Sequence, residues 1–447
     1  VEEGEIEDAN YLLMEAVATR ENLLGADHAD VVKLRERIKQ LEQKANHILE
    51  TEGEFISHAD GSKRLSVQTI HSMETAVKLK QDEAGLEHVA VANLLVQLAN
   101  ALVSKDRYHD ALERLQEALH IFRTNYAPDH ALVIVTLDKV ITVMSCINEC
   151  EEALPLLLEV VHTKTEVYGE MSASLGESLT ELGFVYDRLG NLQEASEVYK
   201  KALAIKRIAV GNNSAEVGQA LNNLGAIMDD LGDSLGAEPY YREGLEIYKN
   251  IYGSENADVA LSLNNLAALL DDRGDFGQAK VYYEEALDIT KKVYGEGSME
   301  VSAALICVAR TMKSLLQYEA AASYYDAAAQ IKETELGPVT SDVALLYDQV
   351  GGMYVKLKWF EMGVNVYGKA YSIRQQLFGE HHPQLAQSLE LMAELQEAWG
   401  HPAEGASLLE EALQVRVGHH NGSRVATDIA DILVKLAALG ECRAEKY

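Results

Sequence analysis

The chain has 447 residues, of which 39 are Lys or Arg and 71 are Asp or Glu, so its formal net charge is −32 at pH 7. Such a charge favours solubility and repels nucleic acid phosphates and anionic membrane surfaces, both of which bind to a cationic face. The longest apolar run is far below the roughly 20 residues that cross a bilayer. We therefore expect neither nucleic acid binding nor direct membrane insertion.

Cysteine usage favours a reducing compartment. Only Cys146, Cys150, Cys307 and Cys442 occur, and they are too few and too scattered to hold the chain together by disulfides. The start of the sequence has no apolar core of the kind found in secretory signals. We expect a soluble intracellular protein of the cytoplasm, or of a plastid or mitochondrion after removal of a targeting segment.

The first segment, residues 1–23, has the pattern of the second helix of a repeated helix pair. Residues 9–25 align without a gap on residues 279–295, and an acidic stub precedes them where a first helix is expected. Two explanations are open. Either a targeting segment or an upstream region has been removed, or the lone helix caps the array.

Residues 24–83 form an irregular, lengthened repeat with a heptad-like helix and a long loop. The 60 residues before the next repeat exceed the period of the later repeats by 18. Apolar residues in this segment form a stripe at heptad-like spacing. We interpret it as part of one lengthened first helix, because it covers fewer than three heptads. Residues 53–64 are predicted to be an extended loop, and residues 73–85 return to second-helix spacing. The apolar stripe consists of Val31, Leu34, Ile38, Leu41, Ala45 and Ile48.

Residues 84–419 are predicted to hold eight contiguous units with a period of 42 residues, and residues 420–447 a capping helix and a tail. The period is clearest between residues 210–251 and 252–293, where nearly every apolar, small or Gly position is matched. A fixed period of this length is typical of architectures in which each unit buries its apolar face against its neighbours. The units begin at Ala84, Tyr126, Tyr168, Val210, Tyr252, Tyr294, Leu336 and Phe378.

Each unit is predicted to be a helix, a tight turn and a second, antiparallel helix. In the unit that starts at Tyr252, one apolar stripe at helical spacing covers residues 263–270 and another covers residues 279–287. Gly274 separates the two stripes, and a glycine at this place allows the positive φ with which many helices end. Gly190 and Gly232 occupy the same place in the two preceding units.

This pattern resembles the tetratricopeptide repeat. The 42-residue length, the LNNL core at 221–224 and the Tyr-Gly ending at 252–253 are similar to those of kinesin light chains. The resemblance implies an all-α, right-handed α-solenoid of antiparallel helix pairs, the TPR superhelix, without a catalytic role. The residues that match the family pattern in one unit are Leu224-Gly225, Ala237, Tyr241 and Gly244.

The resemblance also implies a concave groove lined by the first helices, with the two positions before the Leu-Gly or Leu-Ala pair facing it. Amide side chains carry both a donor and an acceptor, and in kinesin light chains the matching asparagines hold extended cargo peptides. The alternative is that these asparagines bond only along their own helix. The predicted groove residues are Asn222, Asn223, Asn264, Asn265, Gln97, Lys139, Gln349, Arg310 and Lys313.

The charges near these positions favour a neutral or basic partner segment. Four aspartates, at positions 229, 230, 271 and 272, follow the asparagines, and only three cations lie on the same faces. The predicted groove positions of the first helices also lack the set of Lys and Asn residues with which cochaperones of the superfamily bind a C-terminal carboxylate. We predict an adaptor or scaffold that binds a partner segment in the groove. The alternative is a structural subunit or assembly factor of a larger complex, docked by its convex face or its irregular N-terminal region.

No motif for catalysis, a metal or a cofactor is recognised. The sequence contains no HExxH, no Gly-rich phosphate loop and no GxSxG. The Tyr pairs at 240–241, 282–283 and 324–325 are predicted to belong to the core, because the second member of each lies in the helix-packing column. We therefore expect no enzymatic activity, no metal site and no bound cofactor.

Overall fold

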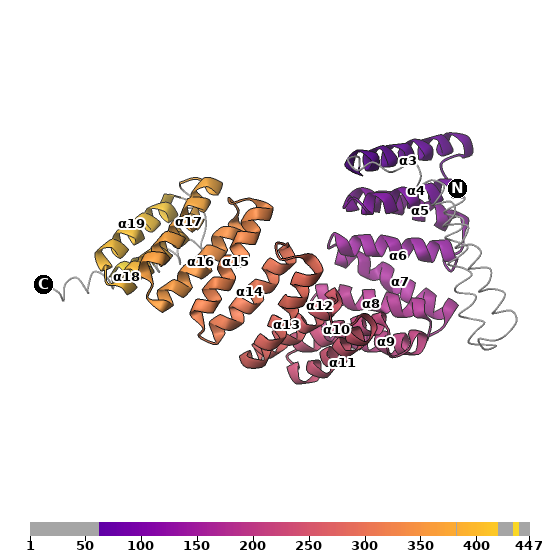
Figure 1. Cartoon of the computed structure of the whole chain (residues 1–447). Coiled ribbons are helices and arrows are strands. Elements are labelled where there is room, and N and C mark those ends of the chain that lie inside the picture. The colour runs from indigo at the N-terminus through magenta and orange to yellow at the C-terminus, as the bar shows by residue number, and fades with distance from the viewer. Residues whose placement is uncertain (1–61, 381, 419–431, 438–447) are drawn as a thin grey trace. The chain divides into compact units, whose positions relative to one another are not determined.

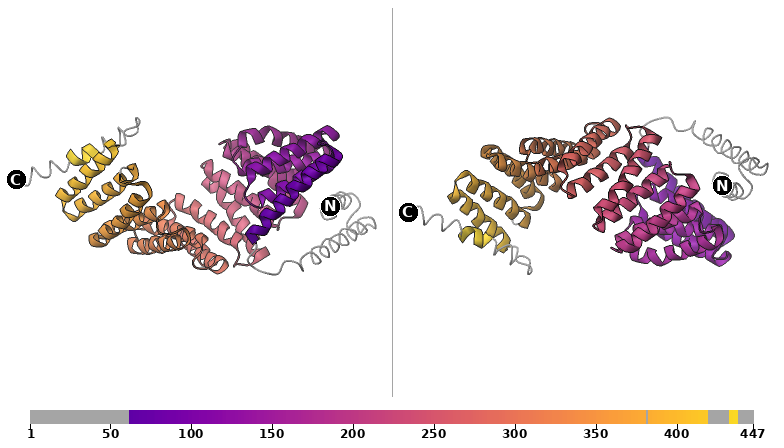
Figure 2. Two further views of the ribbon diagram at one scale, coloured as in Figure 1. Left: turned by 90° about the horizontal axis from the view of Figure 1, so that it is seen from above. Right: turned by 90° about the horizontal axis from the view of Figure 1, so that it is seen from below.

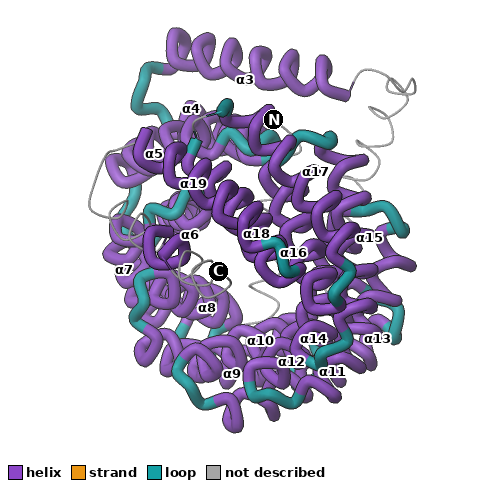
Figure 3. Tube along the Cα trace, turned by 90° about the vertical axis from the view of Figure 1, so that its left-hand side faces the viewer, coloured by secondary structure: helices purple, strands orange, loops and turns teal. Residues whose placement is uncertain are grey.

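The structure is a computed structural model that describes residues 62–380, 382–418 and 432–437. The chain divides into two compact units, the first ending at Ile121 and the second beginning at Phe122. Within the described ranges every regular element is a helix, and no strand occurs (Figure 3). The predicted helix of residues 1–23 and the heptad-like stripe lie outside these ranges.

The first unit contains α3 (Ser62–Ala84), α4 (Val89–Val103) and most of α5 (Tyr108–Asn125). Helices α3 and α4 contact each other. Helix α3 has 23 residues and begins at Ser62, so the second-helix segment predicted for residues 73–85 starts earlier and the end of the predicted loop is helical.

In the second unit, first and second helices alternate, and each first helix packs against the second helix that follows it (Figures 1 and 2). The first helices are α6 (Ala131–Cys146), α8 (Ala173–Arg188), α10 (Ala215–Asp230), α12 (Ala257–Asp272), α14 (Met299–Ser314), α16 (Ser341–Leu357) and α18 (Pro383–Trp399). The second helices are α7 (Cys150–Tyr168), α9 (Leu192–Val210), α11 (Ser234–Tyr252), α13 (Phe276–Tyr294), α15 (Tyr318–Leu336), α17 (Phe360–Phe378) and α19 (Pro402–Gly418). The predicted all-α solenoid of helix pairs is confirmed.

Capping residues fix where each helix begins and ends. The residue before each first helix of this unit accepts a hydrogen bond from a backbone N–H of the first turn, which satisfies one otherwise unpaired donor. The predicted positive φ between paired helices is confirmed at Gly190, Gly232 and Gly274, with values of 78°, 83° and 83°. The N-caps are His130, Ser172, Ser214, Asn256, Ser298, Thr340 and His382.

A tyrosine of the second helix packs against a residue of the first helix that has little or no side chain. A Cβ atom added to Gly225 would lie 2.9 Å from the Tyr241 ring, and one added to Gly183 would lie 2.6 Å from its tyrosine. Tyr241 is 4% exposed and Tyr283 is 2% exposed, so the prediction that the second member of each Tyr pair belongs to the core is confirmed. Burial raises the pKa of Tyr283 to about 12.

The apolar core continues from pair to pair. One cluster of buried residues includes members of α11 through α17. Leu263, Leu266 and Ala267 of α12 are fully buried within it. Each helix pair therefore buries apolar surface against the neighbouring pairs and depends on them for stability.

Replacing Leu266 by Ala is expected to lower the free energy of unfolding by about 2–5 kcal/mol, because it leaves a cavity at a fully buried site. Urea unfolding followed by circular dichroism measures the change. The exposed Leu261 of the same helix is the matched control, and its replacement by Ala is expected to change stability by about 0.5 kcal/mol or less. Equal effects of the two substitutions would contradict the burial of Leu266.

Candidate functional site

The half-buried and exposed positions of the first helices in the second unit are here called the first-helix face. Two hydrogen bonds join neighbouring first helices, one buried and one exposed. Asn222 of α10 donates to Ser262 of α12 at 2.9 Å. Lys313 of α14 donates to Gln349 of α16 at 3.3 Å. Amide and cationic side chains that are far apart in the sequence are therefore brought onto one side of the unit.

The four predicted asparagines differ in their exposure. Asn223, Asn264 and Asn265 are half-buried, and neither Asn223 nor Asn265 has a hydrogen bond to any described side chain. Asn222 is only 7% exposed. Its Oδ1 atom lies 2.9 Å from the place of a Cβ atom on Gly244 of α11. Asn222 thus joins helices in the interior, and the Oδ1 atom of Asn264 is also buried, whereas Asn223 and Asn265 reach the surface.

The remaining predicted residues lie at several places. Gln349 is half-buried, and Lys313 is exposed. Arg310 is exposed and donates to the Tyr283 hydroxyl at 3.2 Å. Lys139 of α6 is half-buried.

Gln97 is also half-buried but belongs to α4. It lies in the first unit, so the site described below does not include it.

Exposed apolar side chains accompany the amides. Leu261 of α12 is 56% exposed and Leu345 of α16 is 50% exposed. Both lie four residues before an amide of the face, Asn265 and Gln349, and therefore on the same side of their helices. This combination of apolar contact area and accessible amides can hold an extended peptide.

The charge of the face changes along the unit. Helices α8, α10 and α12 present the exposed carboxylates Glu177, Glu216, Asp230 and Asp272. Burial, together with the Asp230 charge, raises the pKa of Asp187.

The other two aspartates near the asparagines are engaged within the protein. Asp229 accepts from Ser234 at 2.6 Å, and Asp271 accepts from Thr311 at 3.0 Å. Cations follow on α14 and α16, namely Arg310, Lys313 and Lys356.

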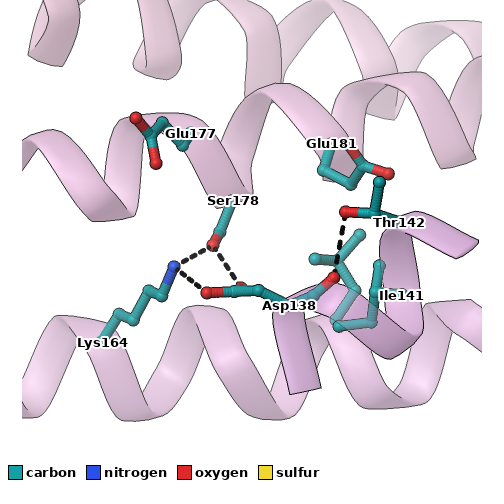
Figure 4. Close-up of a pocket in the computed structure, with 8 residues that line it drawn as sticks. Asp138, Ile141, Thr142, Lys164, Glu177, Ser178 and Glu181 are labelled. Carbon is teal, nitrogen blue, oxygen red and sulfur yellow. Dashed lines mark hydrogen bonds and ion pairs between the residues drawn. The ribbon is translucent and has the colours of Figure 1, made fainter. Parts of the chain in front are cut away.

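An ion pair joins α6 and α7 beside α8, with the Lys164 side chain 3% exposed and the Asp138 side chain 34% exposed (Figure 4). The Lys164 ammonium is 2.8 Å from the Asp138 carboxylate and donates to Ser178 Oγ at 2.8 Å. These residues line a pocket of about 140 Å³, to which Glu177 and Glu181 also contribute. Burial raises the pKa of Asp138, although the Lys164 charge opposes the shift.

Basic residues occupy the repeat position of Lys164 in several other repeats, at separations that are multiples of 42 residues. Arg374 pairs with Asp348 and also donates to Ser388, so it reproduces the arrangement around Lys164. Lys332 pairs with Asp342, and Arg416 pairs with Glu390 at 2.7 Å. Each of these cations is neutralised by a carboxylate of its own chain.

Lys206 of α9 has the same repeat position as these cations but differs from them in its pairing. It is 7% exposed and makes no ion pair or hydrogen bond with any residue of the described ranges. Thr180 and Ala220 stand where its equivalents have Asp138 and Ser178. Burial lowers the pKa of Lys206, while the charges of Glu177 and Glu216 oppose the shift.

The described residues contain no group of three or more His, Cys, Asp or Glu side chains placed to hold a metal ion. None of their helices has the length and apolar character needed to span a membrane.

The geometry defines a protein of packed helical repeats, a class that generally supports protein–protein interaction and not catalysis. The sequence profile of the tetratricopeptide repeat matches most of the chain, and a second profile of the same repeat matches residues 2–30. The chain belongs to the tetratricopeptide repeat family. The main profile matches residues 90–166, 174–250, 216–292, 258–334 and 342–416.

Solved structures similar to this chain include proteins related to kinesin light chains. BtubC (BKLC) from P. vanneervenii is 25% identical, with 56% of this chain and 91% of that chain covered and a TM-score of 0.43. The Podosopora anserina putative kinesin light chain with nearly identical TPR-like repeats is 19% identical, with 46% and 98% covered and a TM-score of 0.42. The apo form of RapI is 14% identical, with 63% and 97% covered and a TM-score of 0.45. No curated protein matches the sequence.

The sequence analysis did not identify Lys206. A signal was present, since basic residues recur at positions 164, 206, 332, 374 and 416, all separated by multiples of 42. The lack of an ion pair distinguishes Lys206 from the others, and pairing depends on the packing of three helices.

Replacing Asn222 by Ala is expected to lower the free energy of unfolding by about 1–2 kcal/mol, because Ser262 loses a buried hydrogen-bond partner. Replacing Asn223 by Ala is expected to change it by about 0.5 kcal/mol or less, since that side chain has no described partner. Chemical unfolding of the two variants side by side measures the difference. A larger effect at Asn223 than at Asn222 would reverse our assignment of their environments.

Replacing Lys206 by Met is expected to raise stability by about 1 kcal/mol, because it removes a buried charge without a partner. Replacing Lys164 by Met is expected to lower it by about 2 kcal/mol, because Asp138 loses its counterion. Since burial lowers the pKa of Lys206 below its ordinary 10.5, its unfavourable contribution is full below the folded-state pKa and disappears as the pH rises toward 10.5. Thermal melts of both variants at several pH values test this, and a destabilised Lys206→Met variant would contradict it.

Proposed function

We propose that the protein is a non-catalytic adaptor whose first-helix face binds an extended segment of a protein partner. The observation that carries the proposal is the row of amides formed by Asn223, Asn265 and Gln349 beside the exposed Leu261 and Leu345. An extended backbone presents donors and acceptors that such amides satisfy. The leucines supply apolar area to its side chains.

The opposite side of the unit, formed by the second helices, is less suited to this role. Several of its charged side chains form ion pairs between neighbouring second helices. Arg207 of α9 pairs with Glu243 of α11 at 2.8 Å, and Lys249 of α11 pairs with Glu285 of α13 at 3.1 Å. A partner would have to compete with these pairs.

The charges support a neutral or basic segment over α8 to α12. Glu177, Glu216, Asp230 and Asp272 are exposed there and have no ion pair with a described cation. A cationic segment lowers their mutual repulsion and is attracted over about 8–10 Å at physiological ionic strength.

A second candidate function is that of a structural subunit docked by another surface. It is favoured by exposed apolar residues where the second helices end: Tyr252 is 44% exposed, Tyr294 47% and Leu336 50%. These residues recur at each repeat junction. In this case the first-helix face plays no part in assembly.

The double substitution Asn223→Ala and Asn265→Ala is expected to weaken partner binding about tenfold or more, at about 1 kcal/mol for each lost amide contact. Stability is expected to stay within about 0.5 kcal/mol. The measurement is a native pull-down with quantitative mass spectrometry, followed by titration of the partner that is found. Asn250→Ala with Asn365→Ala is the matched control, because both residues are exposed on second helices.

Partners that depend on Asn223 and Asn265 but not on the control pair support the adaptor. Partners retained by both variants would favour the structural subunit. The substitutions Tyr252→Ser and Tyr294→Ser then test the junction surface.

A further inference from the structure

Lys206 is the one cation of its column without a carboxylate from the described residues. Lys164, Lys332, Arg374 and Arg416 each have one within ion-pair distance. Burial removes part of the hydration of an ammonium, and a counterion or a hydrogen-bond acceptor compensates this loss. Among the described residues Lys206 has neither an ion pair nor a hydrogen bond, so a bound anion would complete the site.

Repeat equivalence shows where the anion would sit. The stem of Lys206 lies against α8, with Cγ 3.5 Å from the place of a Cβ atom on Gly176. One repeat earlier, the Asp138 carboxylate occupies the space beside Lys164 and lines a pocket (Figure 4). Thr180 has a shorter side chain than Asp138 and uses its hydroxyl to donate to its own helix, at Gly176 O. No carboxylate of the described residues therefore takes the place that Asp138 has beside Lys164.

The rim of this place differs from that of the Lys164 pocket. Glu177 and Glu181 line the Lys164 pocket. The corresponding residues one repeat later are Gln219 and Asn223. Amides that can donate to a carboxylate therefore stand where the Lys164 pocket has two anions, while the charges of Glu177 and Glu216 act on Lys206 itself.

We propose that Lys206 receives a carboxylate of the bound partner segment, in the position that the Asp138 carboxylate has beside Lys164. The inference rests on the proposed function, since the segment lies on the first-helix face. It also defines the partner more closely: one carboxylate enters between α8 and α10, and neutral or basic residues flank it. Glu177 and Glu216 are exposed around the site and favour those flanking residues.

Glu216 is the competing intramolecular counterion. It has the same place relative to Lys206 as Asp342 has relative to Lys332. Asp342 forms an ion pair with Lys332, whereas Glu216 forms none with Lys206 and remains exposed. A carboxylate from the partner therefore meets an unpaired ammonium.

The test uses the full chain and three pools of 11-residue peptides, N-acetylated and random in neutral and basic residues. The first pool has a central Glu and an amidated C-terminus. The second has a central Gln and an amidated C-terminus, and the third has a central Gln and a free C-terminal carboxylate. Bound peptides are quantified by mass spectrometry for wild type, Lys206→Met and the control Lys201→Met, whose lysine is exposed on the same helix.

Wild type and Lys201→Met are expected to retain the Glu pool or the free-carboxylate pool about tenfold or more over the amidated Gln pool, the preference typical of a charge-assisted hydrogen bond. Lys206→Met is expected to lose that preference while still binding peptides. The pool that is preferred identifies the source of the carboxylate.

Equal retention of all three pools by wild type would overturn the role of Lys206 and leave the binding face intact. A preference that persists in Lys206→Met would overturn it too. Retention of no peptide by wild type would overturn both this inference and the proposed function.

Discussion

The close approach of the two helices in each pair is the constraint on which the rest of the structure depends. It requires a residue with little side chain on the first helix wherever a tyrosine of the second helix packs, as Gly225 does against Tyr241. The tyrosine ring then fills the space between layers and becomes buried. Because the same contact recurs along the chain, each pair has a similar geometry, and its first helix presents equivalent positions at the surface.

This regularity is what allows repeats to be compared as internal controls. The repeat position shared by Lys164, Lys206 and Arg374 is an example. Lys206 keeps the positive charge, but the residues around it have changed. Lys164 and Arg374 keep both a carboxylate and a serine, whereas Lys206 has neither. The loss of both groups at Lys206 is recognisable because the sites of Lys164 and Arg374 show the complete arrangement.

The proposed binding face combines features that a partner would recognise separately. Amides offer hydrogen bonds to any backbone, so they give little selectivity by themselves. The exposed charge of the face changes from negative at α8 to α12 to positive at α14 and α16. A segment with an uneven charge distribution would therefore prefer one orientation on it. A single buried ammonium at Lys206 would then fix the register of the segment, because a charge displaced from it remains unpaired.

The sequence by itself determined the helix pairs, their turns and their period. These follow from local rules: helical spacing of apolar residues, glycine where φ is positive, and small residues where helices meet. Only the tertiary structure decided which polar residues reach the surface. Asn222 and Asn223 are adjacent and chemically identical, yet one is bonded to Ser262 in the interior and the other lies at the face. The same holds for Lys206, whose burial and missing counterion arise from three helices packed together, a relation that the spacing along one helix does not contain.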